Sequence, residues 1–295
     1  MNIAYINKTF RGSGLELVER ANAIIAEYIA DGYDLTLRQL FYQFVTRGII
    51  ANKQTEYKRL GSVINDARLA GMLDWDAIVD RTREFECRSH WDSPAEILRS
   101  AANSYGIDTR RDQTDYVEVW IEKDALVGVI EHACKPLDVG YLSCRGFVSQ
   151  SAMWLAAQRF IRKEAEARTF IIHLGDHDPS GIDMTRDIQD RLTLFTSQVI
   201  VERIALTMEQ IEEYQPPPNP AKTTDSRYAS YMAEYGEESW ELDALDPRVL
   251  AELITDKVNR HTEFHKRERL IEREEKERAQ IRRIAQKFNK EKGGD

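Results

Sequence analysis

The stretch "IIHLGDHDPSGIDMTRDI", residues 171–188, places two acids one residue apart directly after a run of mostly apolar residues. The apolar run is typical of a buried β-strand, and the residues from Gly181 onward have the spacing of an amphipathic helix. Asp176 and Asp178 would repel each other at the end of the strand, and crowded carboxylates either take up a proton or bind a cation. Helix capping and loop solvation would also explain such a pair, so the pair alone does not establish a cation site.

Strand-like and helix-like segments alternate around this stretch. The predicted strands are 116–122, 141–147, 168–176 and 198–206. A helix is predicted after each of the first three, which indicates βαβ units and a parallel sheet with its functional groups at the carboxyl ends of the strands. Glu122 ends the first strand, so it would meet Asp176 and Asp178 at one edge of the sheet. Carboxylate oxygens with open water positions suit Mg²⁺.

The first part of the chain has helical periodicity instead. Helices are predicted within residues 14–30, 35–50 and 55–71, the second with Thr36 as its N-cap. Residues 72–83 are predicted to form a short wing or strand. A helix, a turn, a basic helix and a wing together describe a winged helix-turn-helix. A small helical bundle that does not contact DNA is the alternative.

Charge is distributed unevenly along the chain. The net charge of −9 by itself disfavours nucleic acid, but residues 36–68 hold six basic and two acidic side chains, whereas residues 112–260 hold 15 basic and 27 acidic ones. A basic segment beside an acidic domain suits a protein that grips a polyanion with one part and holds a metal with the other, although ordinary surface variation explains it equally well. The basic residues predicted to contact DNA are Arg47, Lys53, Lys58, Arg59 and Arg68.

The length of 295 residues is typical of two domains or one large one. The predicted parts are a helical extension (1–34), the winged-helix domain (35–111), the α/β domain (112–260) and a charged C-terminal helix (261–295). The sequence has no apolar run long enough to cross a membrane, and its N-terminus lacks the apolar core of a signal peptide. Its three cysteines include no C-x-x-C pair, so neither a disulfide framework nor a cysteine zinc site is indicated. We expect a cytoplasmic protein with no membrane contact.

Five blocks of this sequence resemble one family. "DHDPSGID" (176–183) looks like the D-x-D-P-x-G motif of Toprim domains, and "VWIEKDALVGVIE" (119–131) is similar to the strand, Glu-Lys pair and helix that precede it. The other three blocks are "LSCRGFVSQSAMWL" (142–155), "SWELDAL" (239–245) and "TLRQLFYQF" (36–44). The last resembles the stretch that carries a nucleophilic tyrosine on a winged helix. Together the blocks resemble the A subunit of topoisomerase VI, a type IIB topoisomerase, and its relative that makes meiotic double-strand breaks.

The resemblance implies a winged-helix domain followed by a Toprim-type parallel α/β domain. Tyr42 would attack a DNA phosphodiester and become joined to the 5′ phosphate, and Arg38, one helical turn earlier, would steady the phosphate charge. The acids implied to hold Mg²⁺ are Glu122, Asp176 and Asp178, and Lys123 would contact phosphate. Tyr42 is rotated about 100° around the helix from Phe41, which predicts a hydroxyl on the polar side of the helix.

Partners and departures follow from the same resemblance. It implies a C2 homodimer that acts on double-stranded DNA, and it leaves open a separate ATPase subunit, since this chain has no G-x-x-x-x-G-K-[ST] sequence. The family usually has two adjacent tyrosines where this chain has Phe41-Tyr42. The chain is short for such an A subunit and looks most like the stand-alone members on phages and mobile elements. Two alternatives remain: a Toprim nuclease that uses metal-activated water, and a DNA-binding protein without catalysis.

Overall fold

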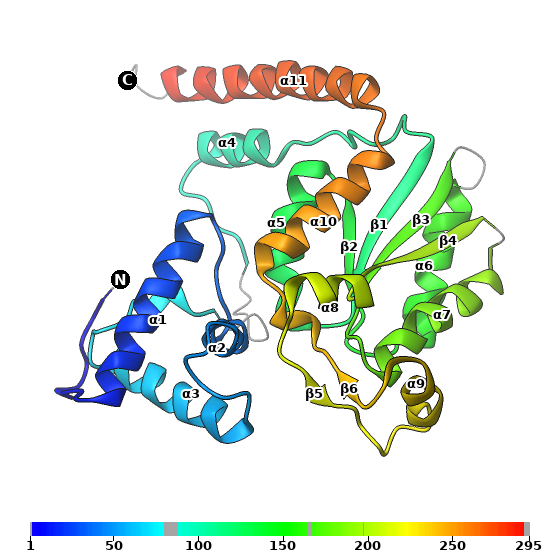
Figure 1. Ribbon diagram of the computed structural model, residues 1–295. Helices are drawn as coiled ribbons and strands as arrows, with labels where there is room; N and C mark the ends of the chain where they lie inside the picture. The colour runs from blue at the N-terminus through cyan, green and yellow to red at the C-terminus, as the bar shows by residue number, and fades with distance from the viewer. Residues whose placement is uncertain (1, 80–87, 164–166, 197, 292–295) are drawn as a thin grey trace.

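The computed structural model describes residues 2–79, 88–163, 167–196 and 198–291 (Figure 1). Its α-helices are α1 (Ser13–Ala30), α2 (Leu37–Thr46), α3 (Gln54–Leu69), α4 (Pro94–Ser104), α5 (Val127–Leu137), α6 (Gln150–Lys163), α7 (Pro179–Thr193), α8 (Met208–Tyr214), α9 (Tyr228–Tyr235), α10 (Pro247–Arg260) and α11 (Phe264–Glu291). Its strands are β1 (Asp115–Ile121), β2 (Gly140–Ser143), β3 (Arg168–Leu174), β4 (Val199–Ala205), β5 (Asn219–Pro220) and β6 (Glu238–Ser239). Short 3₁₀ helices are η1 (Trp75–Ala77), η2 (Asp124–Leu126) and η3 (Leu242–Ala244).

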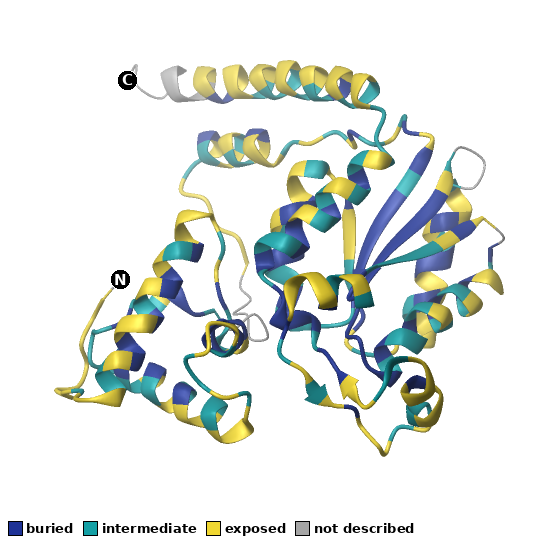
Figure 2. Ribbon diagram, viewed as in Figure 1, coloured by how far each residue is buried: buried dark blue, intermediate teal, exposed yellow. Residues whose placement is uncertain are grey.

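Strands β1 to β4 form one parallel sheet in the spatial order β2-β1-β3-β4. Apolar residues cover both faces of the central strands β1 and β3, because α5 and α10 pack on one face while α6 and α7 pack on the other (Figures 1 and 2). Strands buried on both faces read as continuous apolar runs, which is how they stood out in the sequence. The predicted α/β architecture with a parallel sheet is confirmed.

Helices α1, α2 and α3 share one apolar core at the N-terminal end of the chain. Thr36 caps α2 as predicted: Gln39 N–H donates to Thr36 Oγ1, and Thr36 N–H donates to Gln39 Oε1. A turn through Gly48, whose φ is 67°, leads toward α3. Ala244 of η3 belongs to the same core, so apolar packing joins this helical lobe to the α/β lobe.

The predicted wing lies only partly within the described residues. Of residues 72–83, Trp75–Ala77 form η1, and Ile78 makes an isolated parallel bridge with Leu35. Residues 80–83 fall outside the described ranges. In the described part of this lobe, strand pairing consists of isolated bridges, so the winged helix stays a prediction.

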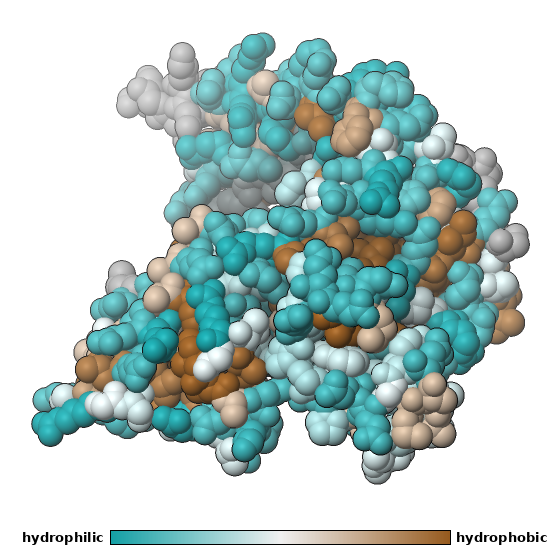
Figure 3. Space-filling view, in the orientation of Figure 1, coloured by the Kyte–Doolittle hydropathy of each residue, from teal (hydrophilic) through white to brown (hydrophobic). Residues whose placement is uncertain are grey.

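Helix α11 packs antiparallel against α4. Arg278 donates to the Tyr105 carbonyl at 2.7 Å, and Arg282 donates to Asn103 Oδ1 at 3.3 Å. Residues 94–104 lie within the predicted winged-helix domain (35–111), and the helical partner of α4 is at the other end of the chain (Figure 1). The surface over α11 is largely hydrophilic (Figure 3), and no helix among the described residues combines the length and apolar character needed to cross a membrane.

Hydrogen bonds and ion pairs also join the two lobes. The Tyr28 hydroxyl of α1 donates to Asp246 Oδ2 at 2.8 Å, just before α10. Arg248 reaches back to Glu27 and Asp31 at 3.1 and 3.0 Å. The two lobes are therefore held together by both apolar and charged contacts.

Candidate functional site

Three acids gather at the carboxyl edge of the sheet. Glu122 directly follows β1, whereas Asp176 and Asp178 follow β3, and the two strands are adjacent and parallel. Glu122 Oε2 accepts a hydrogen bond from the Asp176 N–H at 2.8 Å. Asp178 is the N-cap of α7 and accepts from the Gly181 N–H at 2.6 Å. The sheet topology therefore brings together the acids that the sequence singled out.

The turn between β3 and α7 leaves no space for a larger residue at Gly181. A Cβ added there would lie 3.1 Å from Glu122 Oε2 and well under 3.0 Å from the carbonyl oxygen of Asp176. Arg203 on β4 supports the same turn, since its guanidinium donates to the carbonyls of Gly175, Asp176 and Gly181 at 2.9, 2.6 and 2.9 Å. Backbone contacts thus fix where the acids point.

Lys123 and Arg38 connect these acids to a second acidic pair. Lys123 Nζ lies 2.9 Å from Asp176 Oδ1, 2.9 Å from Glu241 Oε2 and 2.5 Å from Asp243 Oδ1. Arg38 of α2 forms ion pairs with Glu241 and, at 2.7 Å, with Asp243. A single charge network therefore runs from the metal-candidate acids through Lys123, Glu241 and Asp243 to the helix that carries Tyr42.

Burial and crowding change the acidity of this group. Burial raises the pKa of Asp176 to about 7, with Glu122 and Asp243 adding to the rise and Lys123 opposing it. Burial likewise raises the pKa of Glu122, and the neighbouring Asp178 adds to it. For Glu241, burial acts to raise the pKa, but Lys123 and Arg38 outweigh it and bring it to about 2. Asp176 and Glu122 thus hold their protons more tightly than ordinary carboxyl groups, as buried and crowded acids do.

The donor chemistry of this group suits Mg²⁺, because all three candidates are carboxylates. The described residues, however, contain no set of three or more His, Cys, Asp or Glu side chains arranged to hold a metal ion. Asp176 is held by Lys123 and by the Leu242 N–H, and Asp178 caps α7. The residue types fit Mg²⁺. In this structure, however, Lys123 pairs with the Asp176 carboxylate.

Tyr42 is buried, although the sequence places it off the apolar stripe of α2. Only 3% of the residue is exposed, and it belongs to the core of the helical lobe. It lines a cavity of about 270 Å³ together with Lys53 and Glu241. Burial raises the pKa of Tyr42, Glu241 and Asp243 raise it further, and Arg38 opposes them. The tyrosine is therefore a poor nucleophile in this arrangement.

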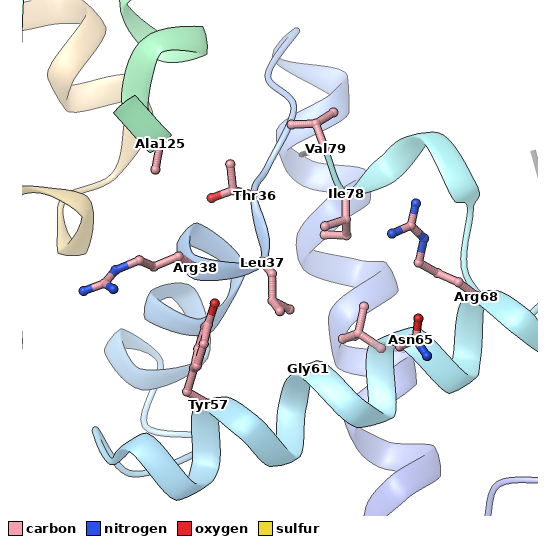
Figure 4. Close-up of a pocket in the computed structure, with 11 residues that line it drawn as sticks. Thr36, Leu37, Arg38, Tyr57, Gly61, Asn65, Arg68, Ile78, Val79 and Ala125 are labelled. Atoms are coloured by element: carbon pink, nitrogen blue, oxygen red, sulfur yellow. The ribbon is translucent and has the colours of Figure 1, made fainter. Parts of the chain in front are cut away.

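Arg38 occupies the junction of the two lobes. Its guanidinium carbon lies 5.7 Å from the centre of the Tyr42 ring. It also lines a cavity of about 540 Å³ between α2, α3 and Ala125 of η2, where Figure 4 shows it extending away from Leu37. Arg38 therefore contacts the candidate nucleophile and the acidic network at the same time.

The basic residues predicted to contact DNA differ in their availability. Arg47 is paired with Glu27 at 2.8 Å, and Arg59 with Glu56 at 3.1 Å. Arg68 donates to the Trp75 carbonyl at 2.5 Å and lies over its indole, so it supports the fold of the helical lobe. The exposed lysines of the predicted set are Lys53 and Lys58. Lys53 is the one beside Tyr42.

The sequence interpretation missed three members of this site. Glu241 and Asp243 belong to the block "SWELDAL", whose resemblance assigns no role to either acid. Arg203 gave a weaker signal, a basic residue inside a strand. Comparisons with protein-family models and with curated proteins give no match for this chain.

Proposed function

We propose that this chain cleaves double-stranded DNA by Mg²⁺-dependent tyrosine transesterification and leaves the 5′ phosphate joined to Tyr42. One observation carries the proposal: Arg38 contacts the Tyr42 ring and pairs with Glu241 and Asp243. Those two acids also hold Lys123 beside Asp176. A candidate nucleophile and candidate metal ligands from separate lobes thus belong to one continuous network.

In the proposed reaction, the Tyr42 oxygen bonds to the phosphorus as the bond to the 3′ oxygen breaks. The tyrosine proton passes to solvent water, and the departing 3′ oxygen takes a proton from solvent water. Arg38 would donate two N–H groups to the phosphate oxygens. The phosphate would therefore compete with Glu241 and Asp243 for the Arg38 guanidinium. A Mg²⁺ ion held by Glu122, Asp176 and Asp178 would stabilise negative charge on the phosphate and leaving oxygen. The phosphotyrosyl link conserves the energy of the broken bond, which permits resealing.

The assembly we propose is the C2 homodimer that the resemblance implies. Each active site would combine Tyr42 of one protomer with the acids of the other, so the network within one chain would be the resting arrangement that DNA has to open. An ATPase, where one takes part, would be a separate subunit. The resemblance of "DHDPSGID" and "TLRQLFYQF" to topoisomerase VI A subunits supports this proposal.

A second candidate is a Toprim nuclease in which Mg²⁺-activated water attacks the phosphate. The burial of Tyr42, with only 3% exposed, favours this candidate, because a buried phenol must be uncovered before it can attack. Both candidates use the same acids, so the chemical state of the 5′ end separates them. A DNA-binding protein without catalysis would leave the DNA uncut.

The test is a denaturing gel after incubation of supercoiled plasmid with the protein and Mg²⁺. We expect a covalent protein–DNA adduct that Tyr42→Phe removes while DNA binding persists. Tyr57→Phe is the matched control, since Tyr57 on α3 packs edge-on against Phe41, with ring centres 5.3 Å apart, and should keep the adduct. If Tyr42→Phe still nicks DNA at the wild-type rate and leaves a free 5′ phosphate, the water-using nuclease replaces the transesterase.

A further inference from the structure

The acids of the candidate site line an open cavity of about 440 Å³ whose outer parts are basic. Its carboxylates are Glu122, Asp124, Asp176, Glu241 and Asp243, and its basic side chains are Arg38, Lys123, Arg145 and Lys222. Asp176 and Asp243 are buried, whereas the side chains of Arg145 and Lys222 are 74% and 75% exposed. The negative charge therefore lies inside and two positive charges lie at the solvent side.

Arg145 is held at the carboxyl end of β2, beside Glu122. The residues on either side of it bond to the end of β1: Cys144 N–H donates to the Ile121 carbonyl at 2.7 Å, and Gly146 N–H donates to the Glu122 carbonyl at 3.2 Å. Its contact with Asp124 among the described residues is made through Nε, at 3.1 Å. The two terminal nitrogens of the guanidinium can therefore bind a second anion in the same plane.

Lys222 lies at the other end of the acid group, in the loop after β5. Its Nζ is 3.6 Å from Asp178 Oδ2, which is close enough for attraction but longer than a hydrogen bond. Because the strand order is β2-β1-β3, the edge of the sheet presents Arg145, then Glu122, then the acids after β3 with Lys222 beside them. Arg145 and Lys222 thus lie on either side of the acids, along the direction that runs across the strands of the sheet.

The five carboxylates outnumber the two inner cations, Arg38 and Lys123, so a phosphate that approaches them is repelled unless further cations meet it first. We infer that Arg145 and Lys222 form a clamp that binds two phosphates of one DNA strand, one on each side of the acid group. This inference rests on the proposed function, and it adds what that function lacks: contacts that lay the strand along the sheet edge so that the phosphate between them meets the acids. The clamp recognises the phosphate backbone and not the bases.

The test measures the affinity of the full-length protein for a short fluorescein-labelled duplex by anisotropy, over a range of KCl concentrations with EDTA present so that no cleavage occurs. Each lost phosphate contact should reduce the slope of log K against log[salt] by about 0.9, which corresponds to roughly tenfold weaker binding at 0.1 M salt. Arg145→Gly and Lys222→Ala should each show this loss, and their combination about twice that change in slope.

The variants are chosen from the backbone. Arg145 has a φ of 54°, a conformation that glycine adopts without strain, so Arg145→Gly removes the charge and keeps the turn. Arg145→Lys keeps the charge and should restore the slope. Lys135→Ala is the matched control, because Lys135 is 71% exposed and paired with one acid, Glu131, as Arg145 is with Asp124. Its slope should equal that of the wild type.

The outcomes separate the clamp from the chemistry. If Arg145→Gly and Lys222→Ala keep the wild-type slope while the wild type binds DNA and forms the Tyr42 adduct, the clamp is wrong and the transesterase stands. If the slopes fall as expected and no adduct forms, the clamp stands and the transesterase is wrong. A wild-type protein that binds no duplex DNA overturns both.

Discussion

Replacement of Gly181 by alanine tests how tightly the acidic turn is built. The added Cβ would lie well under 3.0 Å from the Asp176 carbonyl oxygen and 3.1 Å from Glu122 Oε2. Neither neighbour can retreat easily, because the Asp176 carbonyl is bonded to Arg203 and Glu122 Oε2 is bonded to the Asp176 N–H. The start of α7 must move away by roughly an ångström, and such overpacking costs about 1–3 kcal/mol of stability.

A second glycine provides the control. Gly14 also lies in the first turn of a helix, α1, and a Cβ there would meet Phe10 Cδ1 at 3.6 Å, an ordinary contact. Gly14→Ala should therefore stabilise the protein by about 0.5–1 kcal/mol through helix propensity. The two alanine variants should differ by about 1.5–4 kcal/mol in the free energy of unfolding measured by urea titration.

The same substitution predicts a loss of function. A displacement of about 1 Å at reacting groups can reduce a rate about 100-fold, so Gly181→Ala should form the covalent adduct far more slowly than Gly14→Ala. Equal stability of the two variants would refute the packing argument. Wild-type adduct formation by a destabilised Gly181→Ala protein would instead show that the turn does not position the reacting groups.

Three further predictions concern the acids, the assembly and the lobe contact. Asp178→Ala should abolish Mg²⁺-dependent cleavage and also lower stability by about 1 kcal/mol, because Asp178 caps α7, whereas Asp178→Asn should lose cleavage with a smaller change in unfolding free energy. A mixture of Tyr42→Phe and Asp176→Ala chains should cut one strand of the duplex, since one site of the heterodimer is complete; a mixture that cuts nothing contradicts the shared site. Asp246→Ala should lower stability by about 2 kcal/mol by leaving the Tyr28 hydroxyl without its acceptor. Arg47 and Arg248 lower the pKa of Glu27 below 4.5, and Arg248, outweighing burial, lowers the pKa of Asp246 below 3.8. The contribution of these two carboxylates to stability is therefore complete above about pH 4.5 and is lost as pH falls through their folded pKa values. Urea titrations between pH 6 and pH 3 should show a shallower loss of unfolding free energy for Asp246→Ala than for the wild type.

The sequence predicted the α/β lobe well because its signals are local. A strand covered on both faces must be apolar throughout, and this property made β1 and β3 visible. Their acids follow each strand directly, so parallel pairing was enough to place Glu122 beside Asp176. The cap at Thr36 was equally local, since its partner Gln39 is three residues away.

The remaining features depend on contacts between distant segments. A helical wheel gives the direction of Tyr42 around α2 but not what packs there, and α2 contacts both the other N-terminal helices and η3 of the second lobe. Tyr42 therefore became buried although it lies off the apolar stripe. Arg38 pairs with Glu241, 203 residues further along the chain, and α4 packs on α11. Hydrophobic periodicity does not predict contacts over such separations.

The segment 239–246 explains why the two lobes depend on each other. Trp240 pairs with His177 through both backbone groups, at 2.8 and 2.9 Å, and the Leu242 N–H donates to Asp176 Oδ1 at 2.8 Å, so the segment is fastened to the acidic turn. The acids between and after these residues face Arg38 and Lys123, while Ala244 enters the core of the helical lobe. One short stretch of backbone therefore contacts both the acidic turn and the helix that carries Tyr42. In the proposed reaction, DNA that displaces Arg38 from these acids would also remove its contact with the Tyr42 ring.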